Sequence, residues 1–368
     1  MRRAKPKLLV VALVAIVAVV VTALAAGTAS TAPKAQYSVA LLTTGATNNR
    51  SWANAWTDGA RKAAKDFKVK LTVVGNLDAP DAYVSQGSSF ASKGYNLIIF
   101  AHGAMQGPAV KLAKKFPKVE FLQAPFEFKT KAEQVKSEPP NVGHADAEQQ
   151  YGAFLAGALA GLVTKSNKIG AVYAFPFPAL TRQPEAFRLG AECTNPKVQF
   201  SQKQTNSFTD AALARTAASS LISGGADVVF AAVDQAVQGV IAAAQSAPHT
   251  TYAIPSYFDD HSLGPKVVLT SVLYNLQGVA YDLIKRGVQG KLGPHFYYSY
   301  NLKNLKVGEL APYYNLGSAV SSDAKAKVAQ IRAGVLSGKI RVPDETQGSP
   351  TIGTVNSAAK ISPKSIGC

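Results

Sequence analysis

The sequence predicts an α/β protein made of two lobes, each built on a parallel, doubly wound sheet. Three observations support this fold class. Short apolar runs alternate with segments of helical periodicity along most of the chain after residue 37. The alternation continues in the same way after a basic stretch at residues 129–140, so two similar halves follow each other. With 368 residues, 47% of them hydrophobic, the chain can bury a core too large for one small module.

The N-terminal segment predicts export. Basic residues lie within MRRAKPK at residues 1–7, and an apolar run broken only by Thr22 follows over residues 8–26. Residues 23–25 match an A-x-A cleavage pattern and residues 28–30 offer a second small-residue site, but the run is also just long enough to span a bilayer. A cleaved signal peptide and an uncleaved anchor helix both remain open, and no cysteine follows closely enough for lipid attachment. The positive-inside rule places everything from about residue 31 onward outside the cytoplasm, in a periplasm or at the outer face of the cytoplasmic membrane.

The first half predicts one strand–helix alternation. We expect strands at 37–43, 70–75, 97–101 and 119–123, and helices from Trp52 to Phe67, at 81–92 and at 106–116. In the helix that begins near Trp52, Trp56 lies one turn further on and is expected in the core. The basic stretch at 129–140 is expected to be a loop that leads out of the first lobe.

Residues 141–193 form the stretch around which the second half is organised. A polar, acidic start at 146–150 leads into a helix whose apolar face carries Tyr151, Phe154, Leu155, Ala158, Leu159 and Leu162. Small residues such as Gly157 would let this helix pack closely against a neighbour. A strand at 169–173 precedes the loop FPFP at 175–178, which opens a second helix near residue 179. This loop is a candidate pocket wall because ligands collect beyond strand carboxyl ends; a proline-stiffened surface turn is the alternative.

The alternation continues to about residue 343. Strands are expected at 198–202, 227–231, 252–254, 267–273 and 295–302, helices at 208–223, 235–245, 277–287 and 322–336, and a short strand-like piece at 340–343. We therefore expect residues 37–140 to form lobe 1, with about 257–293 returning to it, and residues 141–256 to form lobe 2, with about 294–343 returning to it. Residues 344–368 are expected to be a loose tail.

Charge and cysteine content limit the choice of partners. The net charge is +17, yet the Lys and Arg residues are scattered and form no nucleic-acid motif, so a weak attraction to anionic envelope polymers or lipids is the better interpretation. Cys193 and Cys368 are the two cysteines. In an oxidising compartment they could pair and tie the tail to lobe 2; two unpaired thiols are the alternative.

Several segments, in this order along the chain, resemble the basic membrane protein family of ABC-transporter solute-binding proteins. They are SWANAWTDGA (51–60), NVGHADAEQQYGAFLAGALAGLVTKSNKIGAV (141–172), FPFPALTRQPEAFRLGAECTNPKV (175–198), NSFTD (206–210), GGADVVF (224–230) and LGPKVVLTSVLYN (263–275). The resemblance implies a type I periplasmic-binding fold, in which two Rossmann-like lobes joined by a hinge close on a ligand. It also implies a purine nucleoside or nucleobase as ligand, no cofactor, and an ABC permease as partner.

Only some of the family's binding residues are found at the matching positions of this chain. The family's stacking aromatics fall on Trp52 and Phe230, and its polar residue before the first motif falls near Asn49. Three positions depart from the family pattern. Ala53 stands where the family has Asn, and Tyr274 stands where it has Lys. Tyr257 stands where the family has a ribose-binding Asp, unless Asp259 or Asp260 replaces that Asp. These departures favour a flat stacked heterocycle over an intact nucleoside.

The residues themselves suggest a similar site. Trp52, Phe177, Phe208, Tyr257 and Tyr274 lie at or just beyond predicted strand ends, where their rings could stack on a ligand. Asp234 could accept hydrogen bonds from ring N–H groups, or it could cap the next helix. Asn49 and His102 are cleft candidates whose alternative is ordinary turn chemistry. Asp259, Asp260 and His261 could suggest a metal, but no second cluster supports one.

The sequence therefore predicts an extracytoplasmic receptor that captures a small purine-like or other heteroaromatic solute and delivers it to an ABC importer. A membrane-tethered sensor with the same pocket is the alternative if residues 8–26 stay uncleaved. An enzyme that acts on nucleosides or sugars, with Asp234, Asp259 or Asp260 as acid or base, is the competing class. It is disfavoured because the chain has no G-x-S-x-G elbow, P-loop or paired His/Cys metal motif.

Overall fold

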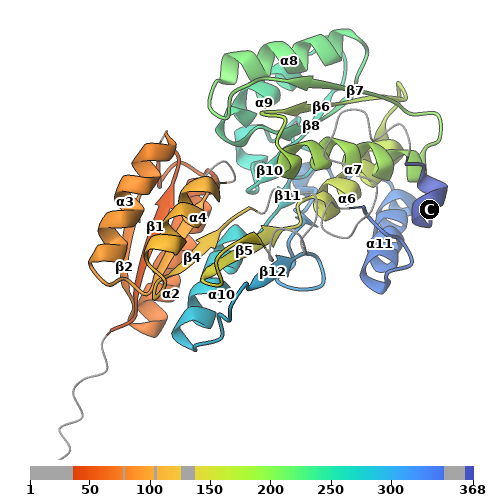
Figure 1. The fold of residues 1–368 in the computed structure, drawn as a ribbon. Coiled ribbons are helices and arrows are strands. Elements are labelled where there is room, and N and C mark those ends of the chain that lie inside the picture. Colours follow the sequence, from red (N-terminus) through yellow and green to blue (C-terminus); the bar gives the residue numbers. More distant parts are fainter. Residues whose placement is uncertain (1–35, 78, 103–105, 126–136, 344–360) are drawn as a thin grey trace, which may run out of the picture. The chain divides into compact units, whose positions relative to one another are not determined.

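The computed structural model describes residues 36–77, 79–102, 106–125, 137–343 and 361–368 (Figure 1). The predicted signal or anchor segment and most of the basic loop at 129–140 lie outside these ranges. None of the helices within them combines the length and the apolar character that crossing a bilayer requires. All elements named below belong to one compact unit, Tyr37–Cys368.

The first sheet has six strands, all paired in parallel, in the order β12-β5-β4-β3-β1-β2. Their bounds are β1 Ser38–Thr43, β2 Lys70–Val74, β3 Leu97–Ala101, β4 Glu120–Gln123, β5 Val142–Ala147 and β12 Tyr297–Tyr300. The helices that alternate with them are α2 Trp52–Phe67, α3 Pro80–Ser92, α4 Gln106–Lys115 and α10 Leu276–Val288 (Figure 1). The predicted parallel, doubly wound architecture is therefore confirmed for this sheet.

Helix α2 matters because its N-terminus lies at the candidate site described below. Ser51 caps it by accepting a hydrogen bond from the Asn54 backbone N–H, and Lys68 ends it in the left-handed conformation. Its flank packs against α10, where a Cβ at Gly59 would lie only 2.1 Å from the Gln277 carbonyl oxygen. The predicted core residue Trp56 is 1% exposed, which confirms that placement.

The second sheet is also parallel, in the order β7-β6-β8-β9. Its strands are β6 Lys168–Tyr173, β7 Gln199–Gln204, β8 Val228–Ala232 and β9 Tyr252–Ile254; the accompanying helices are α6 Gln150–Val163, α7 Pro178–Thr194, α8 Ala211–Ser223, the short η2 Asp234–Ala236 and α9 Val237–Gln245. A small third sheet joins β10 Ser256–Tyr257, β11 Val272–Leu273 and β13 Glu309–Leu310. Further turns and helices are η3 His261–Leu263, η4 Tyr314–Leu316, α11 Ser322–Ser337 and η7 Pro363–Ile366.

Strand β5 differs from the sequence expectation. Residues 146–150 were expected to be the polar, acidic start of a helix, but Asp146 is fully buried at the end of β5. Its charge is compensated by Arg182 of α7, whose Nη1 lies 2.8 Å from Oδ2. His144 in the same strand is likewise buried, with Nε2 2.5 Å from the Glu138 carboxylate. Polar side chains can thus be buried in this interior strand because residues distant in sequence pair with them. Local sequence periodicity cannot predict such pairing.

The strand pairing also shows that two lobe boundaries differ from those expected from the sequence. The second lobe was expected to begin at residue 141 and the chain to return to it at about residue 294, but β5 and β12 both lie in the six-stranded sheet. Within the predicted strand at 267–273, only Val272–Leu273 forms a ladder, apart from an isolated bridge at Val268, and residues 340–343 form no strand. The division of the remaining segments between lobes stays a prediction.

Helices α6 and α7 pack closely through glycine, as the small residues of α6 suggested. A Cβ at Gly157 would lie 1.9 Å from the Phe187 carbonyl oxygen, and a Cβ at Gly190 would lie 2.0 Å from the Phe154 carbonyl oxygen. Both contacts are with backbone, which cannot swing aside. The helices can approach this closely only where neither carries a side chain.

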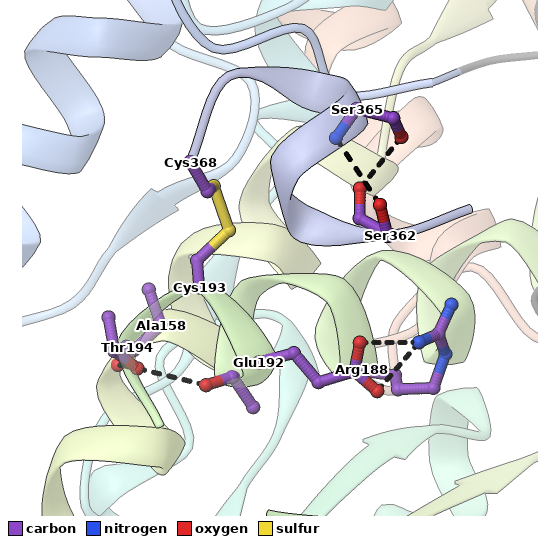
Figure 2. The surroundings of a disulfide bond; sticks show 9 residues. Ala158, Arg188, Glu192, Cys193, Thr194, Ser362, Ser365 and Cys368 are labelled. Carbon is purple, nitrogen blue, oxygen red and sulfur yellow. Dashed lines mark hydrogen bonds and ion pairs between the residues drawn. A yellow bond between two sulfur atoms is a disulfide. The ribbon is translucent and has the colours of Figure 1, made fainter. Parts of the chain in front are cut away.

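The C-terminal residues 361–368 are packed, although residues 344–368 were expected to form a loose tail. Cys368 is disulfide-bonded to Cys193 near the end of α7 (Figure 2), which resolves the alternatives left open by the sequence. Ile361 and Ile366 are each 5% exposed, and the Ile366 carbonyl accepts a hydrogen bond from the Arg341 N–H. The last eight residues therefore complete the surface over α7.

The glycine contact predicts a sharp position dependence for alanine substitution. We expect Gly157→Ala to lower the free energy of unfolding by about 2 kcal/mol or more, since overpacking against backbone forces the helices apart. The matched control is Gly107→Ala in α4, where an added Cβ meets nothing within 4 Å and should be neutral or slightly stabilising. Urea titration measures both; equal midpoints for the two variants would contradict the packing argument.

The disulfide predicts a large contribution to stability. It joins residues 175 positions apart, and we expect Cys193→Ser to cost about 3–5 kcal/mol because the unfolded chain regains the freedom of that long loop. Thermal unfolding should show a lower midpoint for the variant. Reductant should lower the midpoint of the original protein toward that of the variant and leave the variant unchanged. An unchanged midpoint in the variant would show that the tail contributes nothing.

Candidate ligand-binding site

A cavity of about 580 Å³ lies beyond the carboxyl ends of strands from both large sheets. Loops after β1, β3, β4 and β5 contribute from the first sheet, and loops after β6, β7 and β8 contribute from the second. The lining residues are Thr44, Gly45, Ser51, Trp52, Pro80, His102, Pro125, Gln149, Phe175, Phe177, Ala179, Leu180, Asn206, Ser207, Phe208, Thr209, Asp234, Gln235 and Tyr257. Parallel strands direct their carboxyl ends to one edge, so this is where the fold concentrates loops. The volume is in the range of small-molecule pockets.

Aromatic rings form much of the cavity wall. In one group, the Trp52 and Tyr257 ring centroids are 6.4 Å apart and the rings are perpendicular. In a second group, Phe175 stacks on Phe177 at 5.4 Å and contacts Phe208 at 4.8 Å. Flat ligands gain both buried area and ring–ring contact in such a setting.

Trp52 is held in place by two hydrogen bonds. Its indole Nε1–H donates to the Ala101 carbonyl oxygen at the end of β3, at 2.8 Å. Its backbone N–H, at the first residue of α2, donates to Asp234 Oδ1 at 3.1 Å. The ring is therefore positioned before any ligand arrives, which reduces the entropy lost on binding.

Asp234 stands in an unusual environment. Its backbone adopts φ +50°, which non-glycine residues rarely do, and Tyr257 on the same cavity has φ +80°. Burial raises the pKa of the Asp234 carboxyl to about 7; the hydrogen bond from the Trp52 N–H opposes this rise, and nearby Asp260 adds to it. The carboxyl is enclosed by protein yet remains partly accessible from the cavity. It does not cap the following helix, since the described cap of α9 uses no side chain.

A buried amide network fixes the polar end of the cavity. Gln183 Nε2 donates to the Ala179 carbonyl oxygen and to Gln149 Oε1, and Gln183 Oε1 accepts from the Tyr274 hydroxyl. These bonds fix the orientation of the Gln149 amide. Gln149 also lies within hydrogen-bonding reach of the Tyr257 hydroxyl, and its Nε2 is buried.

Six of the residues proposed from sequence line the cavity, namely Trp52, His102, Phe177, Phe208, Asp234 and Tyr257. Four others lie outside the lining: Asn49, Phe230, Asp260 and Tyr274. Their surroundings explain why for three of them. Phe230 is fully buried and stacks on Phe187 at 5.2 Å; Tyr274 is buried against Gln183; Asp260 forms an ion pair with Arg50 at 3.0 Å.

Phe175 and Gln149 are among the lining residues that had not been singled out. Phe175 belongs to the FPFP loop, and that loop as a whole had been proposed as a pocket wall. Gln149 had no such signal, because residues 146–150 were interpreted as the start of a helix. Within the described ranges, no group of three His, Cys, Asp or Glu side chains is arranged to hold a metal ion.

Two parallel sheets with a shared cavity at their carboxyl ends define a two-lobed solute-binding protein of the periplasmic-binding class. Solved structures agree with this fold. A solute-binding protein of an ABC transporter system from Aeropyrum pernix K1 matches with a TM-score of 0.71 at 19% identity, covering 83% of this chain and 92% of that one. A solute-binding protein from Conexibacter woesei DSM 14684 matches with a TM-score of 0.66 at 23% identity, covering 84% and 100%.

The chain belongs to the Bmp family, the PnrA-like ABC transporter substrate-binding proteins, whose family model matches residues 36–345. This confirms the resemblance seen in the sequence. The ABC transporter nucleoside-binding protein BmpA of Lactococcus lactis is 25% identical over 333 residues, which cover 85% of this chain and 90% of BmpA. Basic membrane protein B of Borreliella burgdorferi is 26% identical over 247 residues, covering 66% and 71%. Substrate-binding proteins of this kind capture small molecules outside the cytoplasm for their permeases.

The raised pKa of Asp234 predicts how stability depends on pH. Between about pH 4 and pH 7 the folded protein retains a proton that the unfolded chain releases, so this residue makes the ligand-free protein less stable as pH rises through that window. Asp234→Asn keeps an oxygen to accept from Trp52 N–H and removes the charge. We expect the variant to be more stable than the original at about pH 8, by on the order of 1 kcal/mol.

Thermal midpoints measured from about pH 4 to pH 8 test this expectation. The difference between Asp234→Asn and the original protein should grow with pH. Asp323→Asn, at an exposed position in α11, is the matched control and should follow the original protein throughout. Parallel curves for all three proteins would refute the titration of Asp234 in this range.

Proposed function

We propose that the protein is the receptor of an ABC importer for a small heteroaromatic solute, such as a purine-like base, which binds in the 580 Å³ cavity. The observation that carries the proposal is the aromatic wall built from loops of both sheets, with Trp52 and Tyr257 in one group and Phe175, Phe177 and Phe208 in a second. A ring bound among these side chains would bridge loops that belong to different sheets. Binding energy would then favour the closed arrangement that a permease recognises.

Polar groups supply the directional part of recognition. Asp234 offers carboxyl oxygens to ring N–H groups, and the side-chain amide of Gln149 also belongs to the cavity lining. A heterocycle edge that combines donors and acceptors matches this pair. Such a site binds its ligand without changing it, because the cavity contains no nucleophile activated by an adjacent base among the described residues.

The relatives leave two ligand classes to compare. BmpA of Lactococcus lactis carries the name of a nucleoside-binding protein. A Haloferax volcanii protein named as a putative glucose-binding protein is 30% identical over 180 residues, about half of this chain. The apolar aromatic wall favours a planar ring over a sugar, whose many hydroxyl groups need a more polar lining. Tyr257 in place of the family's ribose-binding Asp favours a base over a nucleoside.

Thermal unfolding with a ligand panel tests the proposal. Residues from about 31 onward would be mixed with purines, pyrimidines, their nucleosides, D-glucose and amino acids. A solute at about a hundred times its dissociation constant stabilises the folded state by about 2.7 kcal/mol. We expect a base to raise the midpoint, Trp52→Ala to abolish the shift, and Trp52→Phe to retain part of it. A shift with D-glucose alone, unaffected by Trp52→Ala, would reject the heteroaromatic ligand.

The same receptor needs an exported or anchored N-terminus, for which residues 8–26 are the proposed segment. The mass of the mature N-terminus separates the two forms. Loss of residues up to about 25 or 30 would indicate a cleaved signal peptide, and a full-length mass would indicate an anchor.

A further inference from the structure

The charge of the cavity differs from the charge of the chain. The sequence carries a net charge of +17, yet the described lining residues include no lysine and no arginine. The one acidic lining residue is Asp234, and burial lowers the pKa of His102 to about 4, so this imidazole is neutral at physiological pH. Among the described lining residues, a ligand therefore meets aromatic side chains, uncharged polar groups and one carboxyl group.

Asp234 lacks the compensating partners that three other acids in the described ranges have. Asp146 is held by Arg182, and Asp260 is held by Arg50. Asp227 accepts hydrogen bonds from the backbone N–H groups of residues 165 and 166 and from the Thr164 hydroxyl. Asp234 accepts from the Trp52 N–H alone among the described hydrogen bonds, and the groups that set its pKa include no lysine or arginine. A cationic ligand group or a strong hydrogen-bond donor on a ligand would supply the partner that the Asp234 carboxyl lacks.

The surroundings of this carboxyl disfavour an anion in two ways. First, Asp234 already occupies the N-terminus of α2, the place where a helix dipole would otherwise attract an anionic ligand. Second, the faces of Trp52, Phe175, Phe177, Phe208 and Tyr257 carry the negative side of the ring quadrupole, which attracts cations and repels anions. Both effects are strong in a partly desolvated cavity.

We propose, building on the proposed function, that the cavity selects heteroaromatic solutes by charge, with a cationic or readily protonated ring preferred over a neutral one and an anionic ring rejected. The solute is then an aromatic amine or N-alkylated heterocycle whose positive ring stacks among the aromatic side chains and pairs with Asp234. Nucleotides and heteroaromatic carboxylates are excluded. A bound cation would also stabilise the ionised form of Asp234, which burial otherwise disfavours.

The positive net charge of the chain does not cancel this selectivity. Charges on the outer surface are screened over about 8 Å at physiological ionic strength, whereas the cavity groups contact the ligand directly. The surface therefore affects how fast a charged solute approaches, and the cavity decides what stays bound.

A matched series of one ring tests the proposal by calorimetry on residues 31–368. Nicotinamide is neutral, 1-methylnicotinamide is permanently cationic, and nicotinate is anionic, all with nearly the same size. Guanosine, 7-methylguanosine and guanosine 5′-monophosphate repeat the comparison on a purine. We expect the cation to bind at least tenfold more tightly than its neutral counterpart, and the anion at least tenfold more weakly.

Asp234→Asn separates the charge from the shape of the site. The variant should lose most of the preference for the cation over the neutral ring, measured as the ratio of their dissociation constants, while Asp323→Asn should leave the whole series unchanged. If the anion binds as well as its neutral counterpart, or if Asp234→Asn preserves the preference for the cation, the charge proposal is overturned and the heteroaromatic receptor stands. If no ring of any charge binds and D-glucose does, both proposals are overturned.

Discussion

The buried ion pair between Asp146 and Arg182 is the interaction on which the arrangement of the site depends. It joins the end of β5 in the six-stranded sheet to the N-terminal part of α7, which lies beside the second sheet. Arg182 also donates to the Ala147 carbonyl oxygen, so the end of β5 is held by three contacts. Removing either partner would leave a charge buried without compensation, which costs several kcal/mol, about 3–5 in measured cases.

The same junction borders the cavity. Gln183 is the next residue after Arg182 in α7, and Gln149 lies just beyond β5; the hydrogen bond between their side-chain amides and the hydrogen bond from the Tyr274 hydroxyl form a network with little freedom to rearrange. Gln149 also belongs to the cavity lining. The polar end of the site is thus a continuation of the buried junction.

The aromatic end of the site is positioned differently. Trp52 is oriented by a carbonyl and a carboxyl acceptor from two separate strand ends, Ala101 at the end of β3 and Asp234 after β8. Asp234 and Tyr257 both adopt a left-handed backbone that costs free energy unless the surroundings hold it in place. Strain and an uncompensated carboxyl in one cavity indicate that stability has been given up for recognition, as is common at binding sites.

The sequence by itself determined the alternating strands and helices, the order of elements, the close glycine packing of α6 and several site residues. Each of these depends on local periodicity, on small side chains or on position after a strand. It did not reveal β5, because the polar side chains of His144 and Asp146 are buried only by virtue of partners elsewhere in the chain. It could not separate Phe230 and Tyr274 from the cavity, since both follow the same pattern as true lining residues and only packing against Phe187 and Gln183 excludes them. The pairing of Cys193 with Cys368 was likewise decided by the tertiary structure, because contact between residues 175 positions apart depends on how the whole chain folds.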